Sequence, residues 1–158
     1  LNITGDLSVS GKVYSNMKIS YGEMTLASAF ASVTYNDVNT FTGDLTSKSS
    51  KDIICDPQNN NLKLATAGIY HIEVYAVWAS NSTGYRRLEV RFYPDSGGVL
   101  TIMDSKENAV SGSTFEMCNN RVYAISEPGS LSLVAEQTSG GSLNLNTATF
   151  RIYKIGEV

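Results

Sequence analysis

The chain has 158 residues, the size of one domain, and a globule of this size buries roughly 68–70% of its unfolded surface, so it needs neither a disulfide nor a metal for stability. Charged residues make up only 17% and the formal net charge is −3, which argues against binding to nucleic acid. No apolar run approaches the ~20 residues of a membrane-spanning helix, so we expect no membrane insertion.

Residues 1–21 alternate between apolar and polar side chains, with Gly5 and Gly11 on the apolar side. A period of two over this length is typical of a β-strand, and a lone strand cannot bury its apolar row without partners. Glycine on that row permits close backbone approach, as around a narrow axis. The segment resembles the glycine-punctuated stretches that lead into the tips of phage fibres; the alternative is an arm that lies on its own domain.

We therefore expect two parts, a lead-in over residues 1–23 and a head domain over residues 24–158. Because Leu1 is not a methionine, we also expect the chain to be a piece of a longer protein. At the start of the head, residues 24–33 contain alanines that favour a helix, but we expect a strand there. The turn-rich residues 35–61 predict loops with short strands between them.

The most informative stretch is residues 66–79, where Gly68 opens a run rich in β-branched and aromatic residues. This composition predicts a long strand that is buried on at least one face. From here on strands and turns alternate, and residues 104–112 are expected to be a polar link. The expected strands are residues 62–64, 69–79, 86–93, 99–103, 114–118, 121–125, 131–137, 143–145 and 150–155. Many short strands at this spacing indicate an all-β sandwich or jelly roll.

The sequence lacks the patterns of an enzyme. His71 is the only histidine and lies inside the long strand, so no base is placed beside a serine nucleophile. Glu73 is the only acid within that strand and has no evident carboxylate partner for glycoside hydrolysis. No Cys or His residues have the spacing of metal ligands, so we expect no metal and no cofactor. Cys55 and Cys118 are interpreted as free thiols, although a disulfide between them stays open.

Several motifs resemble the trimeric jelly roll shared by complement globular heads and tumour necrosis factor. Residues 68–72 match the Gly-x-Tyr-x-hydrophobic strand of that family, and residues 148–155 match its C-terminal strand with a central Phe150. Residues 29–33 are similar to the first strand of the complement head. Residues 127–133 are similar to the family's Gly-Asp-x-hydrophobic-x-Leu strand entry, although Ser130 replaces the usual Asp. The resemblance implies an antiparallel jelly-roll sandwich that forms a homotrimer, with one sheet of each protomer facing the threefold axis.

Strand alternation then separates two sets of side chains. Tyr70, Ile72, Phe150 and Ile152 should point into the protomer core. The side chains expected at the trimer interface are their neighbours His71, Glu73, Tyr75, Arg151, Tyr153 and Ile155. The strand over residues 69–77 carries large side chains on both faces, and a second subunit can cover the face that the core does not.

The lead-in and the head together are similar to a virus fibre tip or capsid appendage, most of all that of a bacteriophage, and no collagen-like Gly-x-y tract is present. This resemblance implies a non-enzymatic structural protein on the virion surface. It would contact other virion proteins through its N-terminal side and bind a host surface component, either a receptor or a glycan. The sequence does not identify receptor-binding residues. The alternatives are a secreted complement-like or cytokine-like binding module and a surface carbohydrate-active enzyme.

Overall fold

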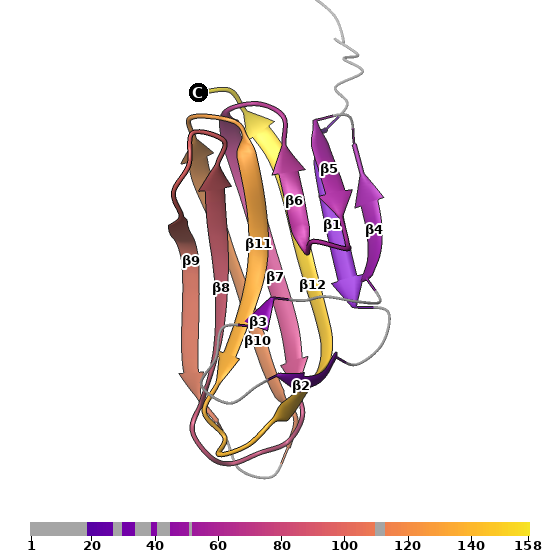
Figure 1. Ribbon diagram of the computed structural model, residues 1–158, viewed down its shortest axis with the longest axis vertical. Coiled ribbons are helices and arrows are strands. Elements are labelled where there is room, and N and C mark those ends of the chain that lie inside the picture. The colour runs from indigo at the N-terminus through magenta and orange to yellow at the C-terminus, as the bar shows by residue number, and fades with distance from the viewer. Residues whose placement is uncertain (1–18, 27–29, 34–38, 41–44, 51, 110–112) are drawn as a thin grey trace, which may run out of the picture.

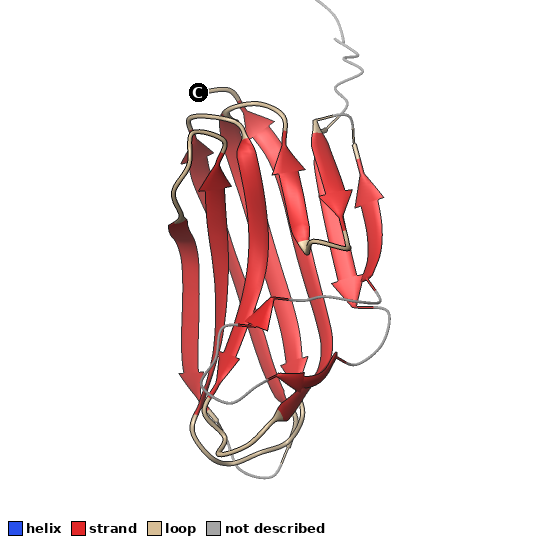
Figure 2. Cartoon of the chain, in the orientation of Figure 1, coloured by secondary structure: helices blue, strands red, loops and turns tan. Residues whose placement is uncertain are grey.

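The computed structural model describes residues 19–26, 30–33, 39–40, 45–50, 52–109 and 113–158. These residues form a two-layer sandwich of antiparallel strands and contain no helix (Figures 1 and 2). The expectation of an all-β jelly-roll sandwich is confirmed. Within the same residues there is no helix long and apolar enough to cross a membrane.

Each layer is a six-stranded sheet. Sheet 1 runs in the order β10 (Phe115–Ile125), β7 (Gly68–Trp78), β12 (Leu143–Gly156), β1 (Tyr21–Leu26) and β4 (Leu45–Ser49), with β2 (Phe30–Val33) also paired to β12. Sheet 2 runs in the order β5 (Ile53–Asp56), β6 (Asn61–Leu64), β11 (Gly129–Gln137), β8 (Tyr85–Pro94) and β9 (Leu100–Asn108), with β3 (Asn39–Thr40) paired to β11.

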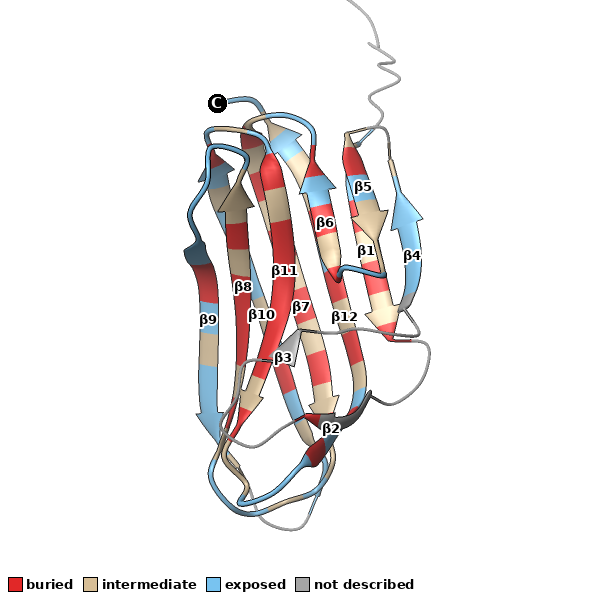
Figure 3. Ribbon diagram, in the orientation of Figure 1, coloured by how far each residue is buried: buried red, intermediate tan, exposed pale blue. Residues whose placement is uncertain are grey.

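The core lies between the sheets and follows from the alternation along each strand. In β7, Tyr70, Ile72, Val74, Ala76 and Trp78 are all buried, and the residues between them are only partly covered (Figure 3). From sheet 2 the core receives the equally regular apolar side chains of β8 and β11, namely Leu88, Val90, Phe92, Leu131 and Leu133. Burial of one face per strand explains why a period of two dominates the sequence.

Several strands are longer than the sequence indicated. The prediction of a polar link over residues 104–112 is wrong for residues 104–108, because β9 extends to Asn108. The two strands expected over residues 114–125 are the single strand β10, and those expected over residues 143–155 are the single strand β12. β9 and β10 lie at sheet edges, where one side of the strand has no neighbouring strand and charged and polar side chains are common.

The start of the head also differs in detail. The single strand expected over residues 24–33 is two strands, β1 and β2, and residues 27–29 between them lie outside the described residues. β1 begins at Tyr21 and pairs with both β12 and β4, so it crosses the boundary expected at residue 23. We propose that the head includes β1 from Tyr21 onward. The lead-in itself, up to residue 18, is outside the described residues.

Candidate functional site

The face of sheet 1 that points away from the core is the candidate interaction surface, and we call it the sheet-1 face. The structure places Tyr70, Ile72, Phe150 and Ile152 in the core, each at most 1% exposed. The residues between them in β7 and β12 therefore point the other way. Five of the six residues expected at an interface lie on this one face: His71, Glu73, Tyr75, Arg151 and Tyr153. The sixth, Ile155, is exposed, but it falls at a register irregularity of β12 between Lys154 and Gly156.

Strand pairing arranges these side chains, with others from β1, β4 and β10, into three rows across the face. The aromatic row consists of Tyr21, Tyr153, His71 and Val122. The charged row consists of Lys48, Glu23, Arg151, Glu73 and Asn120. The hydroxyl row consists of Thr46, Thr25, Thr149, Tyr75 and Cys118. Within a row, directly paired residues have Cβ atoms close enough for their side chains to interact.

The aromatic row leaves apolar surface open in a single protomer. The rings of His71 and Tyr153 are stacked, with centroids 6.2 Å apart. At the two ends of the row Tyr21 is 38% exposed and Val122 is 56% exposed, and Ile155, two residues beyond Tyr153, is also 56% exposed. Side chains of this size gain free energy when another surface covers them.

The charged row alternates in sign across four strands. Lys48 Nζ lies 3.2 Å from Glu23 Oε1, and Arg151 Nε donates to the other carboxylate oxygen of Glu23. The hydrogen bond from Arg151, with a smaller contribution from Lys48, holds the pKa of Glu23 below its usual value although partial burial opposes this shift. The same contact with Glu23 raises the pKa of Arg151. Between Arg151 and Asn120 in this row, Glu73 Oε1 lies 3.7 Å from His71 Nδ1 of the aromatic row.

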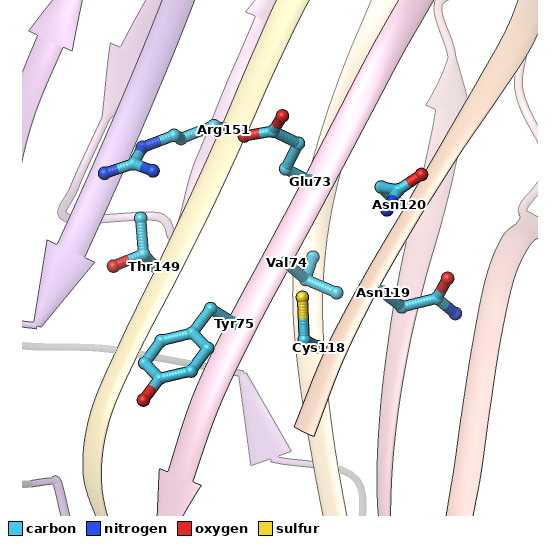
Figure 4. A pocket seen from close by; sticks show the side chains of 8 residues that line it. All are labelled: Glu73, Val74, Tyr75, Cys118, Asn119, Asn120, Thr149 and Arg151. Atoms are coloured by element: carbon cyan, nitrogen blue, oxygen red, sulfur yellow. The ribbon is translucent and has the colours of Figure 1, made fainter. Parts of the chain in front are cut away.

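A hollow of about 340 Å³ interrupts the charged and hydroxyl rows (Figure 4). The Glu73 carboxylate points from β7 toward β12, whereas the Arg151 side chain extends away from Glu73 toward its partner Glu23. Tyr75, Thr149 and Cys118 line the hollow further along. Among the described residues, no group of three His, Cys, Asp or Glu side chains is arranged to hold a metal ion. The hollow combines one carboxylate, one guanidinium and several neutral polar groups, which suits the reception of a polar side chain from another molecule.

The sequence did not single out the members that β1, β4 and β10 contribute. Tyr21 and Glu23 were assigned to the lead-in, but pairing with β12 brings them beside Tyr153 and Arg151. Their spacing of two residues was a usable signal, since Tyr21, Glu23 and Thr25 all point to one side of a strand. Cys118 lies exposed on this face, whereas the Cys55 thiol lies 2.8 Å from the carbonyl oxygen of Lys48, and both thiols are free.

Comparison with known proteins identifies the architecture. No protein-family model matches the sequence, and no curated protein matches it in sequence. Among solved structures, murine APRIL at pH 5.0 superposes with a TM-score of 0.63 at 11% identity, over 87% of this chain and 100% of that one. Eiger TNF from S. frugiperda gives 0.63 at 8% identity, over 89% and 96%. The globular domain of zebrafish complement 1qA gives 0.59 at 11% identity, over 88% and 99%. The chain therefore has the jelly-roll fold of tumour necrosis factor-like ligands and complement globular heads.

Proposed function

We propose that the chain is a non-enzymatic binding head that assembles as a homotrimer through the sheet-1 face. The observation that carries this proposal is the aromatic row, because it leaves Tyr21 and Val122 exposed on a sheet whose other face is already packed. The proposed contact residues are the six predicted from the sequence together with Tyr21 and Val122. The shared fold supports the proposal, since the resemblance to complement and tumour necrosis factor heads implies trimers.

The charged row supports the same arrangement in a second way. A sheet face with both signs of charge in fixed order favours one register of contact and disfavours displaced ones, where like charges would meet. Arg151 and Glu73 are only partly covered in the protomer, at 45% and 38% side-chain exposure, so both have hydrogen-bonding capacity left for a neighbour. An interface that holds a trimer permanently should bury more than ~2,000 Å² in total.

The trimer is tested by size-exclusion chromatography with light scattering. Wild type should elute as three copies at micromolar concentration. Tyr153→Glu should shift the protein to monomers, because it places a charge in the aromatic row. Ile54→Glu is the control: it places the same charge on an exposed apolar strand residue, but Ile54 lies in β5 of sheet 2, so the trimer should persist. A monomeric wild type, or equal effects of the two substitutions, would contradict the proposal.

We further propose that the head belongs to a virus particle, as a fibre tip or capsid appendage that contacts other virion proteins through its N-terminal side. This proposal rests on the alternating, glycine-punctuated residues 1–21 that precede the head. Gold-labelled antibody against the head, applied to particles released from cells that carry the gene, should mark the particle surface in electron micrographs. Recovery of the chain only as a free secreted protein would favour the complement-like or cytokine-like alternative.

A further inference from the structure

The sandwich has two chemically different ends. One end holds the C-terminus and the start of β1, where Lys154 N donates to Ser20 O at 2.8 Å (Figure 1). The opposite end holds the loop over residues 79–84 between β7 and β8 and the loop over residues 138–142 between β11 and β12 (Figure 1). We call these two loops the distal loops. They lie at the end of the sandwich opposite to the C-terminus and to Ser20, where the described part of the chain enters β1.

The distal loops carry no ionisable side chain. Their sequences are Ala-Ser-Asn-Ser-Thr-Gly and Thr-Ser-Gly-Gly-Ser. The loops at the other end differ, since they contain Asp95 and Glu127, and Glu157 follows the last strand. The nearest exposed charges are Lys106 and Glu107 at the end of β9, which pair with β8 beside the first loop. The two loops themselves offer a partner hydrogen bonding and shape.

Arg86 holds the first distal loop in place from the interior of the sandwich. Its side chain is fully buried, and its guanidinium donates to the carbonyl oxygens of Asn81 at 3.0 Å and Thr83 at 3.1 Å. It also lies 6.0 Å from the centre of the Trp78 ring. A buried cation with these partners holds the loop backbone in one conformation, because any movement of the carbonyls would leave the charge without hydrogen bonds.

Gln137 fixes the second distal loop in the same manner. It is fully buried, its Nε2 donates to Gly141 O at 2.6 Å, and its Oε1 accepts from Ser139 N at 2.6 Å. The two loops also touch directly at Gly84, where an added Cβ would lie 1.9 Å from the carbonyl oxygen of Thr138. The distal loops thus form one preorganised surface rather than two independent turns, and preorganisation lowers the entropy cost of binding.

The rigid backbone presents exposed hydroxyl groups. Ser82, Thr83 and Ser142 are exposed, and no hydrogen bond within the described part of the chain uses their side-chain oxygens. A hydroxyl both donates and accepts, so a cluster of hydroxyls matches a partner whose own groups do both. Neutral sugars have this chemistry, whereas a phosphate, sulfate or carboxylate ligand calls for the exposed Arg or Lys that these loops lack.

We infer that the distal loops are the recognition surface of the head and bind a neutral saccharide. This inference deepens the proposed binding function and rests on it. Its geometry, however, involves two loops of one protomer, so it does not require a particular oligomeric state. The recognition surface and the trimer interface are thereby separate, one at the end of the sandwich and one on the sheet-1 face.

The test is binding of the full chain to an array of neutral oligosaccharides printed beside sulfated and sialylated forms of the same oligosaccharides. Wild type should bind one or more neutral members in preference to their acidic forms. The triple variant Ser82→Ala, Thr83→Ala, Ser142→Ala should bind about tenfold or more weakly, because three hydrogen bonds are lost. Ser126→Ala removes an exposed hydroxyl at the opposite end and should leave binding unchanged.

Each possible result bears on the inference. No binding to any neutral member, a preference for acidic members, or full binding by the triple variant would overturn it. Light scattering on the same samples measures the oligomeric state, so failure of sugar binding can be told apart from failure of the proposed trimer. If the protein is a trimer that does not bind neutral sugars, only the saccharide inference is wrong. If it is a monomer whose sugar binding depends on the three hydroxyls, only the trimer proposal is wrong.

Discussion

At the scale of single residues, the structure assigns particular tasks to glycines and buried polar groups that composition alone does not reveal. Gly84 has φ of +72° and sits against the Thr138 backbone, so both its conformation and its lack of a side chain are required. Arg86 and Gln137 are polar but fully buried, and each satisfies loop carbonyls that would otherwise be unpaired beneath the surface.

Gly84→Ala should destabilise the protein by more than about 2 kcal/mol, since it adds steric overlap with a backbone atom to the cost of a left-handed conformation. Gly97→Ala is the control. Gly97 also has a positive φ, of +102°, but an added Cβ would meet nothing within 4 Å, so about 1 kcal/mol is expected. Urea unfolding of both variants measures the difference, and equal losses would show that the contact with Thr138 is unimportant.

The Glu23–Arg151 pair predicts a specific dependence on pH. Arg151 lowers the pKa of Glu23 in the folded state, so the pair stabilises the fold above the carboxyl group's unfolded pKa, and this stability is lost as pH falls through the folded value. Both side chains are partly exposed, so the effect in the protomer is below about 1 kcal/mol. Glu23→Gln should therefore be less stable than wild type at pH 7 and nearly equal to it at pH 3, as measured by thermal unfolding. If the difference in stability between Glu23→Gln and wild type is the same at pH 7 and pH 3, the Glu23–Arg151 pair is not its cause.

At the scale of elements, β1 holds sheet 1 together. It lies between β12 and β4 and pairs with five residues of each. Gly22 within it is in close contact with sheet 2, since an added Cβ would lie 2.5 Å from Ile53 Cγ2. The strand therefore belongs to the core of the domain. The alternation also changes phase here, since the apolar residues lie at odd positions up to Tyr21 and the buried ones, Met24 and Leu26, lie at even positions.

Truncation tests this division of the chain. Removal of residues 1–18 should leave the melting temperature of the head nearly unchanged, because none of the described strand pairs involves those residues. Removal of residues 1–26 should prevent folding, because β4 then loses its partner and Met24 and Leu26 leave the core. Circular dichroism on heating measures both. If the shorter deletion unfolds the head, the lead-in is part of the domain.

At the scale of the whole molecule, the two sheets have different surroundings. Sheet 2 carries a compact ion cluster on its outward face, in which Arg87 lies 2.7 Å from Glu89, 2.8 Å from Asp104 and 3.2 Å from Glu136. These charges satisfy one another within the protomer, which suits a surface that faces water. Sheet 1 instead carries the aromatic row, which a second molecule can cover.

Assembly should therefore be visible in the unfolding of the protein. If the folded protomers form a trimer, the melting temperature should rise with protein concentration, by roughly 5 °C for a hundredfold increase, because dilution favours the separated, unfolded chains. Tyr153→Glu should remove this dependence, and Ile54→Glu should keep it. A melting temperature of wild type that is independent of concentration would show that the protomer folds and remains alone.

The sequence by itself determined the fold class, the long central strand and the two faces of β7 and β12. These features depend on a period of two, which is a local property: each side chain's direction follows from its position in the strand. For the same reason five of the six residues predicted for an interface lie on one face, and the exception, Ile155, falls where the register of β12 shifts. The burial of Tyr70 and Phe150 could be read from residues a few positions apart.

Only the tertiary structure decided which strands lie side by side. The charged row joins Glu23 to Arg151, 128 residues apart, and the distal surface joins Gly84 to Thr138. No local pattern encodes such pairs, because they depend on the order of strands in each sheet and on the register between them. The same is true of Arg86, whose charge predicts a surface position and whose burial follows from the carbonyls that the folded loops bring around it.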